Sequence, residues 1–113
     1  MTDDRSRRGV MTAEEASVHE AHGRLTGDDA ALIDVREPWE WEQVHIPGAT
    51  LIPLGDLPDH LDEIPSDRDV FVHCKSGARS TRAVRWLRQA GRDRAVNVTG
   101  GIEAWQEAGL PVE

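Results

Sequence analysis

The single cysteine of this chain, Cys74, begins a short polar segment, Cys74–Ser80, that contains a glycine. The segment follows the apolar run Val70–His73, which is typical of a short strand, and precedes a patterned stretch over about 78–90 that predicts a helix. A strand that ends in a tight glycine-containing loop before a helix N-terminus turns successive backbone N–H groups inward, and the helix dipole adds positive potential there. A thiol at the mouth of this loop should ionise more readily than a free cysteine, whose pKa is about 8.5. The spacing therefore predicts an activated sulfur nucleophile.

The loop itself supplies the groups that would hold an anion. Gly77 is expected there because inward-facing amides need backbone angles that a residue with a Cβ resists. Ser76 and Ser80 can donate further hydrogen bonds or cap the helix. An apolar stripe along the helix should pack it on a sheet and aim its N-terminus at Cys74.

The elements around this loop alternate short strands with helices. In chain order, the sequence predicts a helix capped by Thr12 and ending near Gly23, a strand over 31–35, a helical turn over 38–42, a strand over 49–53, a helical region over 55–64, the strand and helix around Cys74, a strand over 95–98 and a helix over 102–108. The alternation predicts an α/β domain with a mostly parallel central sheet flanked by helices. Sites in such folds form at the carboxyl ends of strands, where Cys74 lies and where Asp34 and Arg36 follow a neighbouring strand.

Length and composition fit one soluble domain. The chain has 113 residues, of which 38% are hydrophobic and 30% charged. Residues 1–9 are interpreted as a disordered N-terminal arm and residues 10–113 as a single domain. The apolar stretches are far shorter than the ~20 residues of a membrane span, and the charged N-terminus lacks the apolar core of a secretion signal. We therefore expect a cytoplasmic protein that does not engage a membrane.

Metal binding and nucleic-acid binding are both disfavoured. A lone cysteine cannot form an internal disulfide, and the five histidines lack metal-ligand spacing. The net charge is −8, yet seven cationic side chains and a single acid fall between Lys75 and Arg94. Lys75 and Arg79 should create a positive field around the thiol, whereas the outer arginines of the helix are interpreted as a solvated face. The acidic remainder repels nucleic acid.

The number of residues in the loop restricts which anion it can hold. Four residues, Lys75 to Ala78, separate Cys74 from Arg79, one fewer than in the cysteine loops that hold a phosphoryl group in phosphatases. The shorter ring suits a single additional sulfur carried as a persulfide, whose terminal anion would accept the same inward N–H bonds.

Four segments in register resemble single-domain rhodaneses, which are sulfurtransferases. They are Leu32–Trp41, His45–Ala49, Cys74–Ser80 and Val98–Trp105, and together they extend over most of the chain. The loop most resembles those of rhodanese domains that work with enzymes sulfurating ubiquitin-like carrier proteins. The resemblance implies a rhodanese-like three-layer domain and no metal or organic cofactor.

The resemblance also implies a double displacement. The Cys74 thiolate would take the outer sulfur of an anionic donor, thiosulfate or a protein persulfide, and pass it to a thiophilic acceptor: cyanide in vitro, a thiol or a small sulfur-carrier protein in the cell. The implied site has Cys74 as catalytic residue. The substrate-binding residues would be Lys75, Ser76, Gly77, Ala78 and Arg79, and the supporting residues Asp34, Arg36 and Ser80.

Two other functions compete with this one. A non-catalytic rhodanese-like binding module typically loses the cysteine, which is present here with an intact loop. A cysteine-dependent phosphatase or arsenate reductase is disfavoured by the four-residue spacing. We rank the enzyme first.

Several individual roles stay open at this point. Arg79 either binds substrate or forms a structural ion pair with Asp34, and Asp34 and Arg36 are expected to hold loops together. His73 should point away from Cys74, since side chains alternate along a strand. Val44 stands where the family usually has glycine, and because valine resists positive φ, the turn here should differ.

Overall fold

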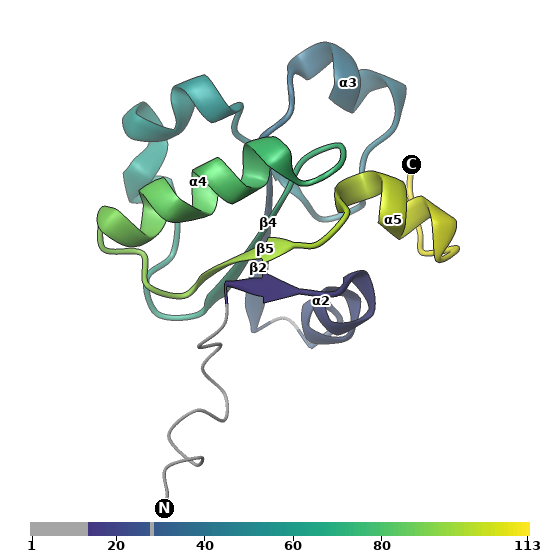
Figure 1. The fold of residues 1–113 in the computed structure, drawn as a ribbon, viewed down its shortest axis with the longest axis horizontal. Helices are drawn as coiled ribbons and strands as arrows, with labels where there is room; N and C mark the ends of the chain where they lie inside the picture. Colours follow the sequence, from purple (N-terminus) through teal and green to yellow (C-terminus); the bar gives the residue numbers. More distant parts are fainter. Residues whose placement is uncertain (1–13, 28) are drawn as a thin grey trace, which may run out of the picture.

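A computed structural model, which describes residues 14–27 and 29–113, contains a five-stranded parallel sheet with helices on both faces (Figure 1). The strand order is β1-β5-β4-β2-β3. The strands are β1 (Glu15–Ala16), β2 (Ala30–Asp34), β3 (Thr50–Leu51), β4 (Asp69–His73) and β5 (Ala95–Val98). The helices are α2 (Val18–Leu25), α3 (Pro38–Gln43), α4 (Ala78–Gln89) and α5 (Gly101–Glu107), with the 3-10 segment η1 (Leu54–Glu63). The predicted α/β class with a parallel sheet is confirmed.

Side-chain alternation along the central strand divides the core into two layers. Val70 and Val72 of β4 pack with Cys74 against α4 and η1, whereas Phe71 packs on the opposite face against α2 and α5. Figure 1 shows α4 on one face of the sheet and α2 on the other. Residues on both faces of β4 are buried, which explains its nearly continuous apolar sequence. The same alternation makes Cys74 leave the strand on the face that α4 covers.

Side chains of α4 and of the turn after it do more than face solvent. Arg82 and Arg85 are exposed, as expected. The prediction of a solvated face is wrong for Arg88, whose Nε donates to the carbonyl of Ala95 at 2.9 Å. It is also wrong for Arg92, which donates to two carbonyl groups at the end of η1 at 2.7 and 2.9 Å. These arginines fasten α4 to its neighbours and so help to fix the helix that follows the loop.

The N-terminal prediction is wrong within the described residues. Glu15 is not in a helix; it lies in β1, which pairs with β5 at the edge of the sheet. Helix α2 begins after Ser17, whose Oγ accepts from the Glu20 N–H at 3.0 Å while the Glu20 carboxylate accepts from the Ser17 N–H at 2.7 Å, and it continues past Gly23 to Leu25. The cap is thus of the predicted kind but lies five residues later. Thr12 and the predicted arm over residues 1–9 lie outside the described residues.

The other predicted elements agree with the structure to within two residues at each end. The region over 55–64 is a 3-10 segment rather than an α-helix. It contains Pro58, and its backbone departs from helical angles at His60. Proline lacks the N–H that a continuous helix needs, which explains the interruption. None of the helices in the described part of the chain is long and apolar enough to cross a membrane.

Candidate active site

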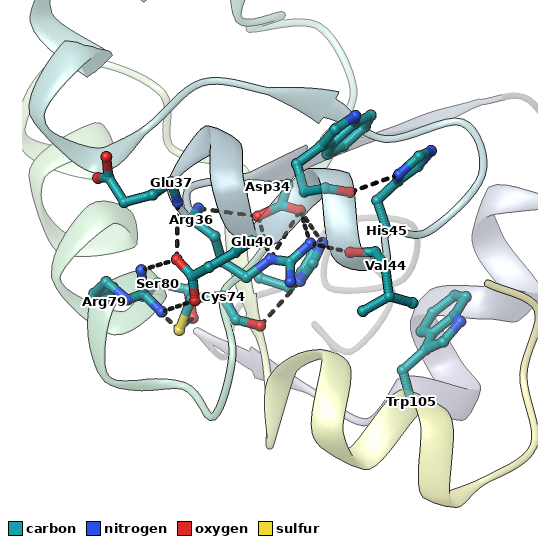
Figure 2. Close-up of polar contacts among 12 residues, drawn as sticks. Asp34, Arg36, Glu37, Glu40, Val44, His45, Cys74, Arg79, Ser80 and Trp105 are labelled. Atoms are coloured by element: carbon teal, nitrogen blue, oxygen red, sulfur yellow. Dashed lines mark hydrogen bonds and ion pairs between the residues drawn. The ribbon is translucent and has the colours of Figure 1, made fainter. Parts of the chain in front are cut away.

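The sulfur of Cys74 lies in a nest of hydrogen-bond donors at the start of α4, of which Figure 2 labels Ser80. Its Sγ accepts from the Gly77 N–H at 3.1 Å and the Ser80 N–H at 3.3 Å, and the Ser80 Oγ lies 3.3 Å away. Gly77 has φ = 120°, so the expectation that the loop needs glycine there is confirmed. Cys74 itself is only 1% exposed. The arrangement suits an anion centred on sulfur.

Two opposing effects act on the thiol. Burial raises the pKa of Cys74, whereas hydrogen bonds from the Ser80 hydroxyl, the Ser80 N–H and other loop N–H groups lower it. The hydrogen bonds dominate, and the pKa of Cys74 is lower than that of an ordinary cysteine. The sulfur is therefore more nucleophilic at neutral pH than its burial alone would allow.

The start of α5 holds the loop from behind. The Ile102 N–H donates to the Cys74 carbonyl at 2.9 Å and the Glu103 N–H to the Lys75 carbonyl at 3.1 Å. A Cβ on Gly101 would lie 2.5 Å from both carbonyl oxygens. Because these carbonyl groups point toward α5, the N–H groups that follow them are free to face the sulfur.

Both cations of the loop are paired with acids. Arg79 donates two hydrogen bonds to the Glu40 carboxylate, at 2.7 and 2.9 Å, and Lys75 Nζ lies 3.9 Å from Glu103 (Figure 2 for Arg79). The guanidinium group of Arg79, helped by the Glu37 N–H, lowers the pKa of Glu40 to about 2 even though burial acts in the opposite direction. The positive charge of Arg79 is therefore largely compensated, and that of the exposed Lys75 only in part.

The structural ion pair, one of the two roles open for Arg79, exists, but its partner is Glu40 and not Asp34. Asp34 is fully buried and pairs with Arg36, which donates to it from Nε and Nη2 at 2.8–3.1 Å and from its backbone N–H (Figure 2). Arg36 also donates to the Val44 carbonyl at 2.8 Å, so the two residues hold the α3 loop in place, as expected. The sequence reasoning missed Glu40, although an acid in the helix that follows the neighbouring strand could have suggested a partner for Arg79.

Val44 and His73 behave as the sequence predicts. Val44 has φ = −165°, an extended conformation, so the segment that usually has glycine does without positive φ here. His73 is paired in register with Asp34 and faces it, with Nε2 3.5 Å from the carboxylate, while its Nδ1 lies 3.1 Å from the Cys74 carbonyl. Burial lowers the pKa of His73. The ring thus lies on the opposite side of the sheet from the sulfur and is poorly placed to act as its base.

A second polar partner of the site, Asn97 of β5, was also missed. Its Oδ1 lies 2.5 Å from the Ser80 Oγ, and its side chain is buried beneath the start of α4. The signal for it was a polar residue inside an otherwise apolar strand, Ala95–Val98. A buried polar side chain in such a strand needs a partner.

The remaining loop residues face outward. Lys75, Ser76 and Ala78 are exposed. Beside Lys75, a groove of about 200 Å³ runs between α3 and α5 and is lined in part by Trp39, which is 62% exposed, and by Gln106. Among the described residues, no cluster of histidine, cysteine and acidic side chains could hold a metal ion.

Comparison with known proteins identifies the family. The model of the rhodanese-like domain matches residues 17–108. A sulfurtransferase of Allochromatium vinosum is 46% identical over 85 residues, which cover 75% of this chain and 79% of that protein. The probable adenylyltransferase/sulfurtransferase MoeZ of Mycobacterium tuberculosis is 44% identical over 88 residues, which cover 76% of this chain but only 22% of that protein. The crystal structure of a rhodanese-related protein from Thermoplasma volcanium superposes with a TM-score of 0.81 at 31% identity and covers 88% of this chain and 97% of that one. The chain therefore belongs to the rhodanese-like domain family.

Proposed function

We propose that this protein is a sulfurtransferase that carries sulfane sulfur as a persulfide on Cys74. The observation that carries the proposal is the set of N–H donors from Gly77 and Ser80 that converge on Sγ. These donors favour an anionic sulfur over a neutral thiol. Sulfur transfer is also the activity named for the similar proteins of A. vinosum and M. tuberculosis.

The reaction is a double displacement at sulfur. The Cys74 thiolate attacks the outer sulfur of an anionic donor such as thiosulfate; a new S–S bond forms, the donor's S–S bond breaks, and sulfite leaves with the electron pair. The acceptor then attacks the outer sulfur of the persulfide and releases the Cys74 thiolate. Cyanide would yield thiocyanate, and a thiol acceptor would itself become a persulfide. Two transfers replace one more difficult step, which is the advantage of covalent catalysis.

The loop backbone, over residues 75–79, would stabilise the anions of both steps. Preorganised N–H groups are worth several kcal/mol, about 3 per donor, where charge develops in a transition state. Arg79 is assigned a positioning role rather than a direct contact with the donor, because both of its terminal nitrogens bind Glu40. The Lys75 side chain is 62% exposed and only 3.9 Å from Glu103, in a solvent-screened contact, so it would still attract an anionic donor.

The acceptor would approach along the groove between α3 and α5. A flat, exposed ring at Trp39 and the amide side chains of Gln43 and Gln106 suit a protein segment rather than an inorganic ion. A small sulfur-carrier protein is therefore the proposed acceptor in the cell, and a protein persulfide an alternative donor to thiosulfate. The chain spans only about a fifth of the length of MoeZ, which is named a probable adenylyltransferase as well as a sulfurtransferase. We therefore also propose that a separate partner protein supplies the adenylyltransferase activity. The predicted cytoplasmic location fits thiol chemistry of this kind.

Intact-protein mass spectrometry tests the proposal. The native chain and Cys74→Ser are incubated with thiosulfate, and in parallel with a cysteine desulfurase and cysteine as the source of a protein persulfide. We expect a gain of one sulfur atom that is lost on addition of cyanide and absent in the variant. No gain from either donor would refute the persulfide and leave a non-catalytic binding module as the better function.

A further inference from the structure

The Ser80 hydroxyl lies among three acceptors but has one hydrogen to donate. Its oxygen is 3.3 Å from the sulfur of Cys74, 3.3 Å from the Gly77 carbonyl and, in the shortest contact, 2.5 Å from Oδ1 of Asn97. The amide oxygen can only accept, so in the shorter contact the hydroxyl must be the donor. While that bond is made, the hydrogen is not available to the sulfur.

The orientation of Asn97 is fixed from its other side. Its Nδ2 donates to Oε1 of Glu15 at 2.9 Å and to Oγ1 of Thr81 at 3.2 Å. An ionised carboxylate offers no hydrogen, so the nitrogen of the amide must face Glu15 and the oxygen must face Ser80. Glu15 is held in turn by the Thr99 hydroxyl at 2.8 Å, and the register of β1 and β5 sets it opposite Asn97.

We propose that Asn97, oriented by Glu15, is a positioning residue that holds the Ser80 hydroxyl hydrogen while Cys74 is a thiol and releases it when the sulfur becomes an anion. In the thiol state, the S–H group donates to the Ser80 oxygen and the hydroxyl donates to Asn97. In the thiolate or persulfide state, the hydroxyl must turn toward the sulfur, and Asn97 loses its donor. Asn97 thereby competes with the sulfur for one hydrogen bond and makes the anion less stable than the loop alone would.

This inference rests on the proposed role of Cys74 as nucleophile, but the positioning residue Asn97 and its partner Glu15 lie outside the Cys74–Ser80 segment. Charged groups reach the surroundings of the sulfur from every neighbouring element. They are Arg79 of α4 with Glu40 of α3, Lys75 of the loop with Glu103 of α5, His73 of β4 with Asp34 of β2 and its partner Arg36, and Glu15 of β1 behind Asn97. The variants below leave all of these unchanged except Glu15.

The pH dependence of alkylation tests the competition directly. Because Cys74 is the only cysteine, the rate of its reaction with iodoacetamide against pH reports its pKa without ambiguity. We expect Asn97→Leu to lower that pKa by about 0.5 to 1 unit, the equivalent of one neutral hydrogen bond. Glu15→Gln should also lower the pKa of Cys74. The new amide group can donate to Oδ1 of Asn97, so Asn97 can turn its nitrogen toward Ser80.

Two controls separate this effect from damage to the loop. In a Ser80→Ala background, Asn97→Leu should leave the pKa unchanged, and Glu14→Gln, next to Glu15 and exposed, should behave as the native chain. Loss of loop structure would remove N–H donors and raise the pKa, which is the opposite sign. A raised or unchanged pKa in Asn97→Leu and Glu15→Gln, or a lowering that persists without the Ser80 hydroxyl, would overturn the proposal.

Alkylation needs no sulfur donor, so the two proposals can fail separately. If the protein never gains sulfur from thiosulfate or a desulfurase, yet shows the expected pKa changes, the sulfurtransferase proposal is refuted and the proposed positioning role of Asn97 is supported.

Discussion

The ion pair between Glu40 and Arg79 gives the sharpest test of how the loop is held. Glu40→Gln removes the charge but retains a side chain of the same size, which can still accept from the Glu37 N–H that now binds the carboxylate at 2.9 Å. Arg79 would lose its charged partner and keep at most one good acceptor. Because Arg79 forms part of the first turn of α4, the loss should be felt as a loosening of the loop that carries Cys74.

The magnitude follows from the pKa of Glu40. A decrease from 4.5 to about 2 corresponds to about 3 kcal/mol of stabilisation at neutral pH if the whole difference were realised, at 1.36 kcal/mol for each unit. The Arg79 side chain is 33% exposed, so solvent screens the pair, and we expect Glu40→Gln to lower the free energy of unfolding by about 1–2 kcal/mol. This is a large fraction of the stability of a small domain.

The sign of the pH dependence is fixed by the same values. A carboxylate whose pKa is lower in the folded state stabilises the fold above its unfolded pKa, and the contribution is lost as the pH falls from about 4.5 toward 2. At pH 3, less than half of it should remain, because the unfolded carboxylate is then protonated and the folded one is starting to be. The difference between native chain and variant should therefore shrink in acid.

Urea unfolding of the native chain, Glu40→Gln and Glu42→Gln at pH 7 and pH 3 measures this. Glu42 lies in the same helix and is exposed, which makes it a matched control for loss of one negative charge, and its substitution should change stability by less than about 0.5 kcal/mol. A deficit in Glu40→Gln that is equally large at both pH values would refute the reasoning, because it would then arise from packing and not from the ion pair.

Two further substitutions probe what holds the loop and α4. Gly101→Ala should destabilise the protein and slow alkylation of Cys74, because the new Cβ would meet two loop carbonyl groups at 2.5 Å. Gly109 is also at positive φ but has open space around it, so Gly109→Ala should cost only about 1–2 kcal/mol of backbone strain. Equal effects at the two positions would contradict the steric argument. Arg92→Met should lower the free energy of unfolding by about 1–3 kcal/mol, because it removes the two hydrogen bonds that Arg92 donates to the carbonyl groups of Leu61 and Ile64. Urea unfolding against Arg85→Met on the exposed face measures this, and a loss no greater than that of the Arg85 variant would count against this role.

The loop that carries the chemistry could be predicted from sequence because its signals are local. A buried strand, a glycine that must adopt φ = 120° and an amphipathic helix follow one another within a few residues around Cys74. Each of these depends on backbone geometry that the sequence encodes directly. The loop needs no distant residue to be recognised.

The N-terminal strand could not be predicted in the same way. Strand β1 consists of only two residues, Glu15 and Ala16, and their pairing partners Asn97 and Val98 lie at the other end of the chain. The sequence contains two capping patterns close together, one at Thr12 with Glu15 and one at Ser17 with Glu20. The first pattern predicted a helix at Glu15, but Glu15 pairs with the distant β5, and the helix begins at the second pattern. Two-residue strands at a sheet edge carry too little periodicity to be seen.

The partners of the loop side chains were hidden for a related reason. Glu40 lies 39 residues from Arg79, and Asn97 lies 17 residues from Ser80. A sequence restricts the type of partner that a buried cation or hydroxyl needs, but which acid or amide meets it depends on how β2 and β5 flank β4. Asp34 was a reasonable candidate for Arg79 by chemistry, and the nearer Arg36 binds it instead.

The pairing of the loop cations fits an enzyme that must both accept sulfur and release it. If Lys75 and Arg79 were free, their charges would lower the pKa of Cys74 further, but nucleophilicity at sulfur falls as the pKa falls. A strongly bound persulfide anion would also be a poor donor to an acceptor. With Glu40 and Glu103 compensating the cations, the sulfur is held chiefly by N–H dipoles, which stabilise an anion without fixing it there. The competition of Asn97 for the Ser80 hydrogen acts in the same direction, so the acids and amide around this loop moderate the anion that its backbone favours.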